Sequence, residues 1–224
     1  MAIETPIIII NFKLYKEASG EKALSLAKIV EGVSEETGVE MAVAPNVVDL
    51  KDVASRLGSE VYAQHVDPIP YGAYTGRVPP QYLKEVGVDG SLINHSERVL
   101  DDETIRRSLD LLRTLDLKSV LCAATPEIFM RILGPNVKAD AVAIEPPELI
   151  GTGRAVSKYK PEIIEYAAEA IQAFDTPLLC GAGIVSGEDV KRAMELGAEG
   201  ILVASGVVKA KDPAGVLRDF AVNM

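Results

Sequence analysis

Four polar side chains stand where short apolar runs of this sequence end. Asn11 and Lys13 follow the run "IIII", His95 closes "SLINH", and Glu145 follows "AVAI". A carboxylate in such a place costs free energy unless it is paired or has a chemical task, and burial would raise its affinity for a proton. Glu145 alone would most simply pair with a nearby Lys or Arg. Beside an imidazole and an ammonium group, it could instead remove a proton while its neighbours stabilise the resulting negative charge.

The two histidines have different neighbours. Ser96 and Glu97 after His95 suit the first turn of a short helix, whose backbone N–H groups would point at the imidazole and keep it a neutral hydrogen-bond donor. Glu97 could also hold Lys13 in place, although a glutamate that favours the helix start is an equally good interpretation. His65, in "AQHVDP", is interpreted as a structural residue.

Small residues follow two later apolar runs. The stretches "GAG" at 181–183 and "ASG" at 204–206 would let the backbone approach an anion such as a phosphate closely. We expect Gly183, Ala204 and Ser205 to contact it. A tight strand-to-helix turn at the glycines is compatible with the same role.

The segment after Glu145 reads "PPELIGTG". Pro146 and Pro147 restrict the backbone next to the carboxylate, whereas Gly151 and Gly153 permit unusual dihedral angles at the tip. We therefore expect a stiff root and a mobile lid that could exclude water from the site.

Eight short and mostly apolar runs predict parallel strands covered by helices. We expect these strands at 7–12, 39–45, 60–66, 90–95, 118–124, 141–146, 176–183 and 200–205. Amphipathic segments predict helices at 19–38, 79–87, 101–116, 125–134, 160–174, 186–197 and 212–220. Ser19 is a possible N-cap of the first helix and Gly38 its stop.

Strict alternation of strands and helices predicts an α/β protein, a single (β/α)8 barrel domain over residues 1–224. Such a barrel carries its active site at the carboxyl ends of the strands, where the polar residues above would converge. The alternative is an open doubly wound sheet. That fold normally has a glycine-rich turn after its first strand, where this chain reads "NFKLYKEASG".

The composition excludes several kinds of partner. The chain has 33 acidic and 23 basic residues, a formal net charge of −10, and no basic cluster that would bind nucleic acid or anionic lipid. Cys122 and Cys180 lie in apolar runs and are interpreted as small buried hydrophobes. We expect no metal, because no His/Cys/Asp spacing suggests a site, and no signal peptide, because a basic leader and a small-residue cleavage site are absent. We also expect no membrane span, since no run approaches about 18 apolar residues. A cytoplasmic protein is the default.

Three motifs, "NFK", "NHSERV" and "AIEPPELIGTG", resemble the signatures of the triosephosphate isomerase family, in order and on the expected strands. The resemblance covers essentially the whole chain and is strongest to the compact archaeal-type branch. It implies a TIM barrel that interconverts dihydroxyacetone phosphate and D-glyceraldehyde 3-phosphate through an enediol(ate), in glycolysis and gluconeogenesis and without a cofactor. Glu145 would be the base, His95 the neutral electrophile and Lys13 the cation.

The resemblance also implies how the substrate is held. Asn11 would donate a hydrogen bond beside Lys13, and the backbone of the lid would reach the phosphate. The substrate-binding residues would then be Asn11, Lys13, Ile150, Gly151, Gly183, Ala204 and Ser205.

The segment "VDPIPYGAYTGRVPP", 66–80, is longer than a tight strand-to-helix turn requires. An apolar patch that marks an interface would result if four of its residues were exposed, Ile69, Tyr71, Tyr74 and Val78. The resemblance implies that this loop, with Thr75 at its tip, reaches a neighbouring subunit beside its Lys and His. We expect a homo-oligomer, a tetramer rather than a dimer. A loop folded over its own barrel is the alternative.

Two other functions fit a barrel of this kind. A Schiff-base aldolase would need a desolvated lysine deep in the barrel, whereas the only strand-end lysine is Lys13, beside Asn11. A non-catalytic scaffold would have no need to keep a base, an electrophile, a cation and a lid together. A coupled assay with glyceraldehyde 3-phosphate discriminates among the three.

Overall fold

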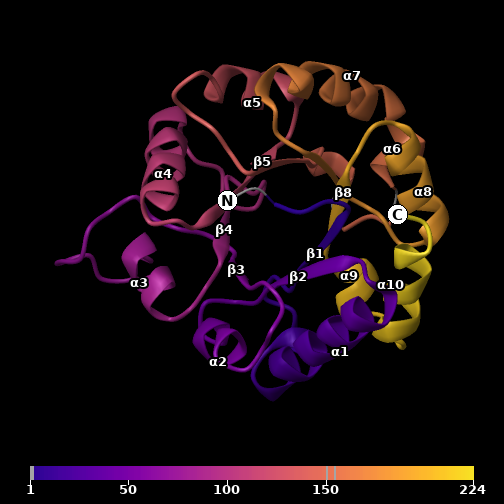
Figure 1. The fold of residues 1–224 in the computed structure, drawn as a ribbon, viewed down its shortest axis with the longest axis horizontal. Helices are drawn as coiled ribbons and strands as arrows, with labels where there is room; N and C mark the ends of the chain where they lie inside the picture. The colour runs from indigo at the N-terminus through magenta and orange to yellow at the C-terminus, as the bar shows by residue number, and fades with distance from the viewer. Residues whose placement is uncertain (1–2, 150, 154) are drawn as a thin grey trace.

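The computed structural model describes residues 3–149, 151–153 and 155–224, and its strands form a single parallel sheet. The strands are β1 (Ile7–Asn11), β2 (Glu40–Ala44), β3 (Tyr62–Ala63), β4 (Gly90–Ile93), β5 (Lys118–Ala123), β6 (Ala141–Ile144), β7 (Leu178–Gly181) and β8 (Gly200–Val203). Their order is β2-β1-β8-β7-β6-β5-β4-β3. A bridge between Val43 and Val61 joins the two edges, so the sheet curls into the nearly closed ring of Figure 1.

The helices surround this ring (Figure 1). They are α1 (Glu21–Thr37), α2 (Leu50–Ala54), α3 (Pro80–Glu85), α4 (Asp102–Thr114), α5 (Pro126–Ile132), α6 (Val156–Tyr159), α7 (Pro161–Ile171), α8 (Gly187–Glu195), α9 (Ser205–Val208) and α10 (Pro213–Ala221), with short 3-10 turns η1 (Lys16–Ala18), η2 (Pro147–Leu149) and η3 (Gln172–Phe174). The predicted (β/α)8 TIM barrel is confirmed. Each predicted strand occurs, in a shorter form than its apolar run.

The predicted start of α1 was wrong, and its end was right. The N-cap is Gly20, at φ 62°, while the hydroxyl of Ser19 donates to the carbonyl of Tyr15 at 2.9 Å. At the other end Gly38 has φ 71° and its N–H donates to the carbonyl of Ser34 at 2.8 Å. The left-handed backbone at both glycines, which side chains disfavour, lets the chain enter and leave the helix abruptly.

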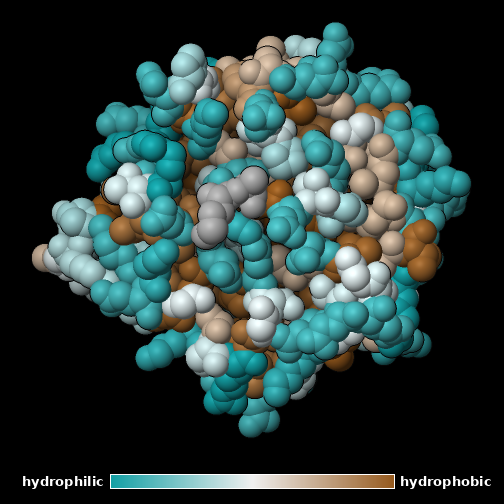
Figure 2. All heavy atoms as spheres, viewed as in Figure 1, coloured by the Kyte–Doolittle hydropathy of each residue, from teal (hydrophilic) through white to brown (hydrophobic). Residues whose placement is uncertain are grey.

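The apolar residues form two layers. One lies inside the barrel and includes Ile9, Tyr62 and Cys122, whereas the other, which includes Cys180, fills the space between strands and helices. Both cysteines are buried and unpaired, as predicted. Figure 2 shows hydrophilic residues over most of the outer surface on the viewed face. Within the described ranges, no helix is long and apolar enough to cross a membrane.

The loop between β3 and α3 projects away from the barrel (Figure 1). Asp67 closes its base, since its N–H donates to the carbonyl of Val78 and its carboxylate accepts the Val78 N–H, both at 2.8 Å. Tyr71 and Tyr74 are exposed. Ile69 and Val78 are partly buried, so two of the four residues that would form the apolar patch are exposed and the other two are only partly accessible.

Candidate active site

Most of the residues predicted for the site lie at the carboxyl ends of the strands. Asn11 ends β1, Lys13 follows it, His95 lies just after β4, and Glu145 directly follows β6. A small pocket of about 30 Å³ collects seven of the predicted residues, Asn11, Lys13, Glu145, Gly151, Gly183, Ala204 and Ser205. His95 lines an adjoining cavity of about 580 Å³ that also contains Asn11 and Lys13. The predicted contact at Ile150 falls outside the described residues.

Glu145 and His95 face each other. The Oε2 atom of Glu145 lies 3.4 Å from the Nε2 atom of His95, and each side chain is only 7% exposed. Burial raises the pKa of the Glu145 carboxyl, against the opposing influence of His95 and Lys13. Among the described residues neither Oε2 nor Nε2 has a hydrogen-bond partner. Buried polar atoms without partners are rare, and here both are available to a third molecule.

The loop after β4 sets the tautomer of His95. The backbone N–H of Glu97 donates to Nδ1 at 3.1 Å, and the N–H of Arg98 donates to the carbonyl of His95 at 2.7 Å. Because Nδ1 accepts a hydrogen bond, the neutral ring carries its proton on Nε2, which points at Glu145. The backbone donor was predicted correctly. The short helix predicted after His95 was wrong, because residues 96–98 form a turn and a bend.

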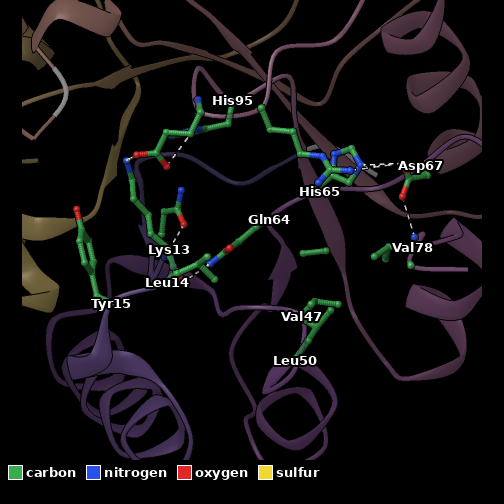
Figure 3. A pocket seen from close by; sticks show the side chains of 15 residues that line it. Lys13, Leu14, Tyr15, Val47, Leu50, Gln64, His65, Asp67, Val78 and His95 are labelled. Carbon is green, nitrogen blue, oxygen red and sulfur yellow. Dashed lines mark hydrogen bonds and ion pairs between the residues drawn. The ribbon is translucent and has the colours of Figure 1, made fainter.

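Lys13 is held at both its backbone and its ammonium group. Its backbone has φ 47°, its N–H donates to Oδ1 of Asn11 at 2.9 Å, and its carbonyl accepts from Nε2 of Gln64 at 3.0 Å. The ammonium lies 2.8 Å from Oε1 of Glu97, and Figure 3 shows it extending toward the loop that carries His95. This ion pair agrees with the role that the sequence allowed for Glu97.

Two amides outside the predicted catalytic and substrate-binding residues tie the site together. Gln64 also donates to the carbonyl of Ala44 at 2.9 Å, so it joins the loop of Lys13 to the end of β2. Asn94, at φ 62°, donates to the carbonyl of Cys122 at 3.0 Å and accepts from Leu100 N–H at 2.9 Å. Their signal was an amide at the end of an apolar run, which is the same signal that identified Asn11.

Glu145 is packed tightly on the side of β7. A Cβ atom added to Gly181 would lie 2.4 Å from Cγ of Glu145, so only glycine leaves room for the carboxylate in this position. The thiol of Cys122, inside the barrel, is hydrogen-bonded to the same carboxylate. Burial and the nearby Glu145 raise the pKa of this thiol well above its usual value, so it remains protonated and can donate.

The pocket beside Glu145 is lined by small residues from three loops. Gly183 and its neighbour Ala182 have φ 74° and 78°, which turns the chain after β7, and Gly151 and Gly153 have φ 71° and 70°. The unusual dihedral angles predicted at these last two glycines are confirmed. Backbone that lacks bulky side chains can bring N–H groups close to an anion.

His65 lies away from this pocket, in the wall of the larger cavity. Its Nε2 atom is 3.1 Å from Oδ1 of Asp67, and burial lowers the pKa of its imidazole. Burial opposes ionisation of Asp67, yet the hydrogen bonds from Val78 and Arg77 hold the pKa of Asp67 below its usual value. These contacts place His65 at the base of the projecting loop, in agreement with a structural role.

Comparison with known proteins agrees with this geometry. A family model described as triosephosphate isomerase matches residues 6–220. A triosephosphate isomerase of Methanothermus fervidus is 47% identical over 99% of this chain and 100% of its own length. Those of Saccharolobus solfataricus, at 45%, and Methanobrevibacter smithii, at 43%, cover 99% of this chain and 97% and 100% of their own lengths. The chain belongs to the triosephosphate isomerase family.

Proposed function

We propose that this chain is an intramolecular aldose-ketose isomerase that interconverts dihydroxyacetone phosphate and D-glyceraldehyde 3-phosphate through an enediol(ate). The observation that carries the proposal is the pair of unpartnered atoms, Oε2 of Glu145 and Nε2 of His95, 3.4 Å apart beside Lys13. A base, a neutral donor and a cation close together at the carboxyl ends of the strands are what proton transfer next to a carbonyl requires.

Glu145 is the base. The ionised carboxylate takes a proton from C1 of dihydroxyacetone phosphate, and the electrons of the broken C–H bond form the C1–C2 double bond while charge moves to the oxygen on C2. The protonated carboxyl then returns the proton to C2. Burial that raises the pKa of Glu145 increases its strength as a base.

His95 and Lys13 stabilise the intermediate. The Nε2–H of His95 donates to the oxygens on C1 and C2, between which a proton moves as the ketone becomes an aldehyde. The Lys13 ammonium, held 2.8 Å from Glu97, offsets the charge of the enediolate and of the phosphate. A Schiff-base role suits this lysine poorly, because an ion-paired ammonium is not a free nucleophile.

The phosphate is bound by Asn11 and by backbone at the three loops. The contacts are proposed at Gly151, Gly183, Ala204 and Ser205, which line the small pocket, and at Ile150. The lid of residues 146–153 closes over the bound substrate and keeps water from the enediolate, with the 3-10 turn Pro147–Leu149 as its stiff root.

We also propose a homo-oligomer, a tetramer in preference to a dimer, in which the loop 66–80 of one subunit enters the large cavity of its neighbour. The 580 Å³ cavity beside Lys13 and His95 and the projection of the exposed Tyr74 support this arrangement. Leu14 and Val48, on adjoining loops, are 82% and 86% exposed, and they would add apolar surface to such an interface.

We propose further that the chain is one domain that acts in the cytoplasm, in glycolysis and gluconeogenesis. The experiment that tests the function is a coupled assay in which purified protein converts glyceraldehyde 3-phosphate to dihydroxyacetone phosphate. Turnover by the parent protein together with its loss in Glu145→Gln supports the proposal. A folded parent protein without turnover refutes it.

A further inference from the structure

One side chain that no part of the mechanism uses lies between the two pockets. Three residues line both the small pocket and the 580 Å³ cavity, Asn11, Lys13 and Tyr15. The first two are already assigned to the substrate. Figure 3 shows the side chain of Tyr15 extending from the same turn as Lys13, and Tyr15 lies where the small pocket and the cavity adjoin.

The backbone holds Tyr15 from both sides. Its N–H donates to the carbonyl of Phe12 at 3.3 Å, which closes the turn that contains Lys13. Its carbonyl accepts from the N–H of Ala18 at 3.0 Å and from the hydroxyl of Ser19 at 2.9 Å. The Cα atom of Tyr15 is therefore fixed relative to Lys13, and little freedom remains except rotation of the side chain.

A cation restricts that rotation. The ammonium of Lys209 lies 4.1 Å from the centre of the Tyr15 ring, well within the range of a cation–π interaction. Lys209 is the C-cap directly after α9, and its N–H donates to the carbonyl of Ser205 at 3.1 Å. The ring thus connects the turn that carries Lys13 to the helix that begins at Ser205, and both of these residues line the small pocket.

We propose that Tyr15 is a positioning residue whose ring, held by Lys209, forms a partition on the phosphate side of the small pocket and sets the spacing between Lys13 and Ser205. This inference rests on the proposed isomerase function. The ring and not the hydroxyl carries the role, because a flat apolar surface excludes water and attracts the ammonium.

Loss of this partition should be measurable as elimination of phosphate from the enediolate. In an enediolate that is poorly held, the electron pair of the oxygen on C1 can form a carbonyl while the C1–C2 double bond shifts to C2–C3 and the C3–O bond breaks. Inorganic phosphate then leaves and a three-carbon enol aldehyde remains. A pocket that keeps the phosphate in place and water out suppresses this step. Phosphate released per isomerisation therefore reports on the partition, and general loss of stability does not change this ratio.

The experiment compares Tyr15→Phe, Tyr15→Ala, Lys209→Met and Lys209→Arg. For Tyr15→Ala and Lys209→Met we expect the KM for glyceraldehyde 3-phosphate and the inhibition constant of inorganic phosphate to rise roughly three- to tenfold. The ratio of released phosphate to isomerised substrate should rise with them. Tyr15→Phe and Lys209→Arg retain the ring and the cation, so both should stay within about twofold of the parent protein. Lys211→Met, an exposed lysine two positions along the chain, is the matched control.

Light scattering on each variant shows whether assembly is retained, since Tyr15 also lines the large cavity. Tyr15→Phe as impaired as Tyr15→Ala would overturn the role of the ring, and a change in KM for Lys209→Met no larger than for Lys211→Met would overturn that of the cation. Turnover by the parent protein tests the isomerase function separately: a parent without turnover refutes that function, whereas an active parent with unaffected variants refutes only the role of Tyr15.

Discussion

The carboxylate of Glu145 and the imidazole of His95 face each other across 3.4 Å, and the structure gives neither facing atom a hydrogen-bond partner among the described residues. The backbone N–H of Glu97 on Nδ1 directs the other ring proton at the carboxylate side of the site. We propose that a ligand with two adjacent oxygen-bearing carbons contacts both atoms from the pocket side, with one carbon at the base and its oxygens at the donor.

Replacement of the base tests its assignment. Glu145→Gln keeps the shape of the side chain but cannot accept a proton, so we expect kcat to fall by several orders of magnitude while substrate still binds. Glu145→Asp, which retracts the carboxylate, should lose less. Steady-state kinetics and inhibition by inorganic phosphate measure the two effects, and a Glu145→Gln variant within about tenfold of the parent rate would contradict the assignment.

The acid side of the pH profile follows from burial. Because burial raises the pKa of Glu145 above the ordinary value of 4.5, the base becomes protonated, and the rate falls, at a higher pH than for an exposed glutamate. NMR of protein labelled with ¹³C at glutamate carboxyl groups measures this pKa directly, with Glu145→Gln to assign the signal. A Glu145 resonance that titrates at or below 4.5 would refute the expected shift.

Gly181 leaves the room that the base occupies. The extra Cβ of Gly181→Ala, 2.4 Å from Cγ of Glu145, must displace the carboxylate, and a displacement of this size should lower kcat by about a hundredfold. Gly32→Ala, in α1 where the added Cβ meets nothing within 4 Å, is the control and should keep full activity. Equal kinetics for the two variants would show that the position of the carboxylate does not depend on Gly181.

The assembly is tested at the projecting loop. Asp in place of Tyr74 or Thr75 would bring a charge into the neighbouring cavity, so we expect dissociation to smaller species and reduced activity. Val222→Asp changes another exposed apolar side chain, 79% exposed, and should have no effect. Light scattering and activity at micromolar concentration are the measurements, and a fully active monomer of the parent protein would contradict the proposal.

Much of the fold could be predicted because parallel strands buried on both faces leave continuous apolar runs, as at β1. The exact ends of the strands and the shortest helices could not be predicted from these runs. β3 is limited to Tyr62–Ala63, and directly before it the N–H of Val61 donates to the carboxylate of Asp89 in place of a neighbouring strand. The four- and five-residue helices α2, α6 and α9 are too short to show an amphipathic period.

The site divides in the same way. Ionisable side chains at strand ends, such as Glu145 and His95, could be predicted because burying such a group costs free energy unless it is paired or has a chemical role. Gly181 and Tyr15 could not, because their importance depends on the distances to Glu145 and Lys209. These contacts join residues far apart in the chain, and composition and periodicity carry no information about them.

Solvent exchange tests the central claim most directly, that Glu145 moves a proton between carbons through an enediol(ate). In deuterated water the carboxyl can exchange the proton it has removed before returning it, so product and recovered substrate should both carry deuterium on carbon, by NMR and mass spectrometry. Glu145→Gln should produce essentially none under the same conditions. Rapid turnover by the parent protein with no solvent deuterium on carbon in either compound would contradict this account.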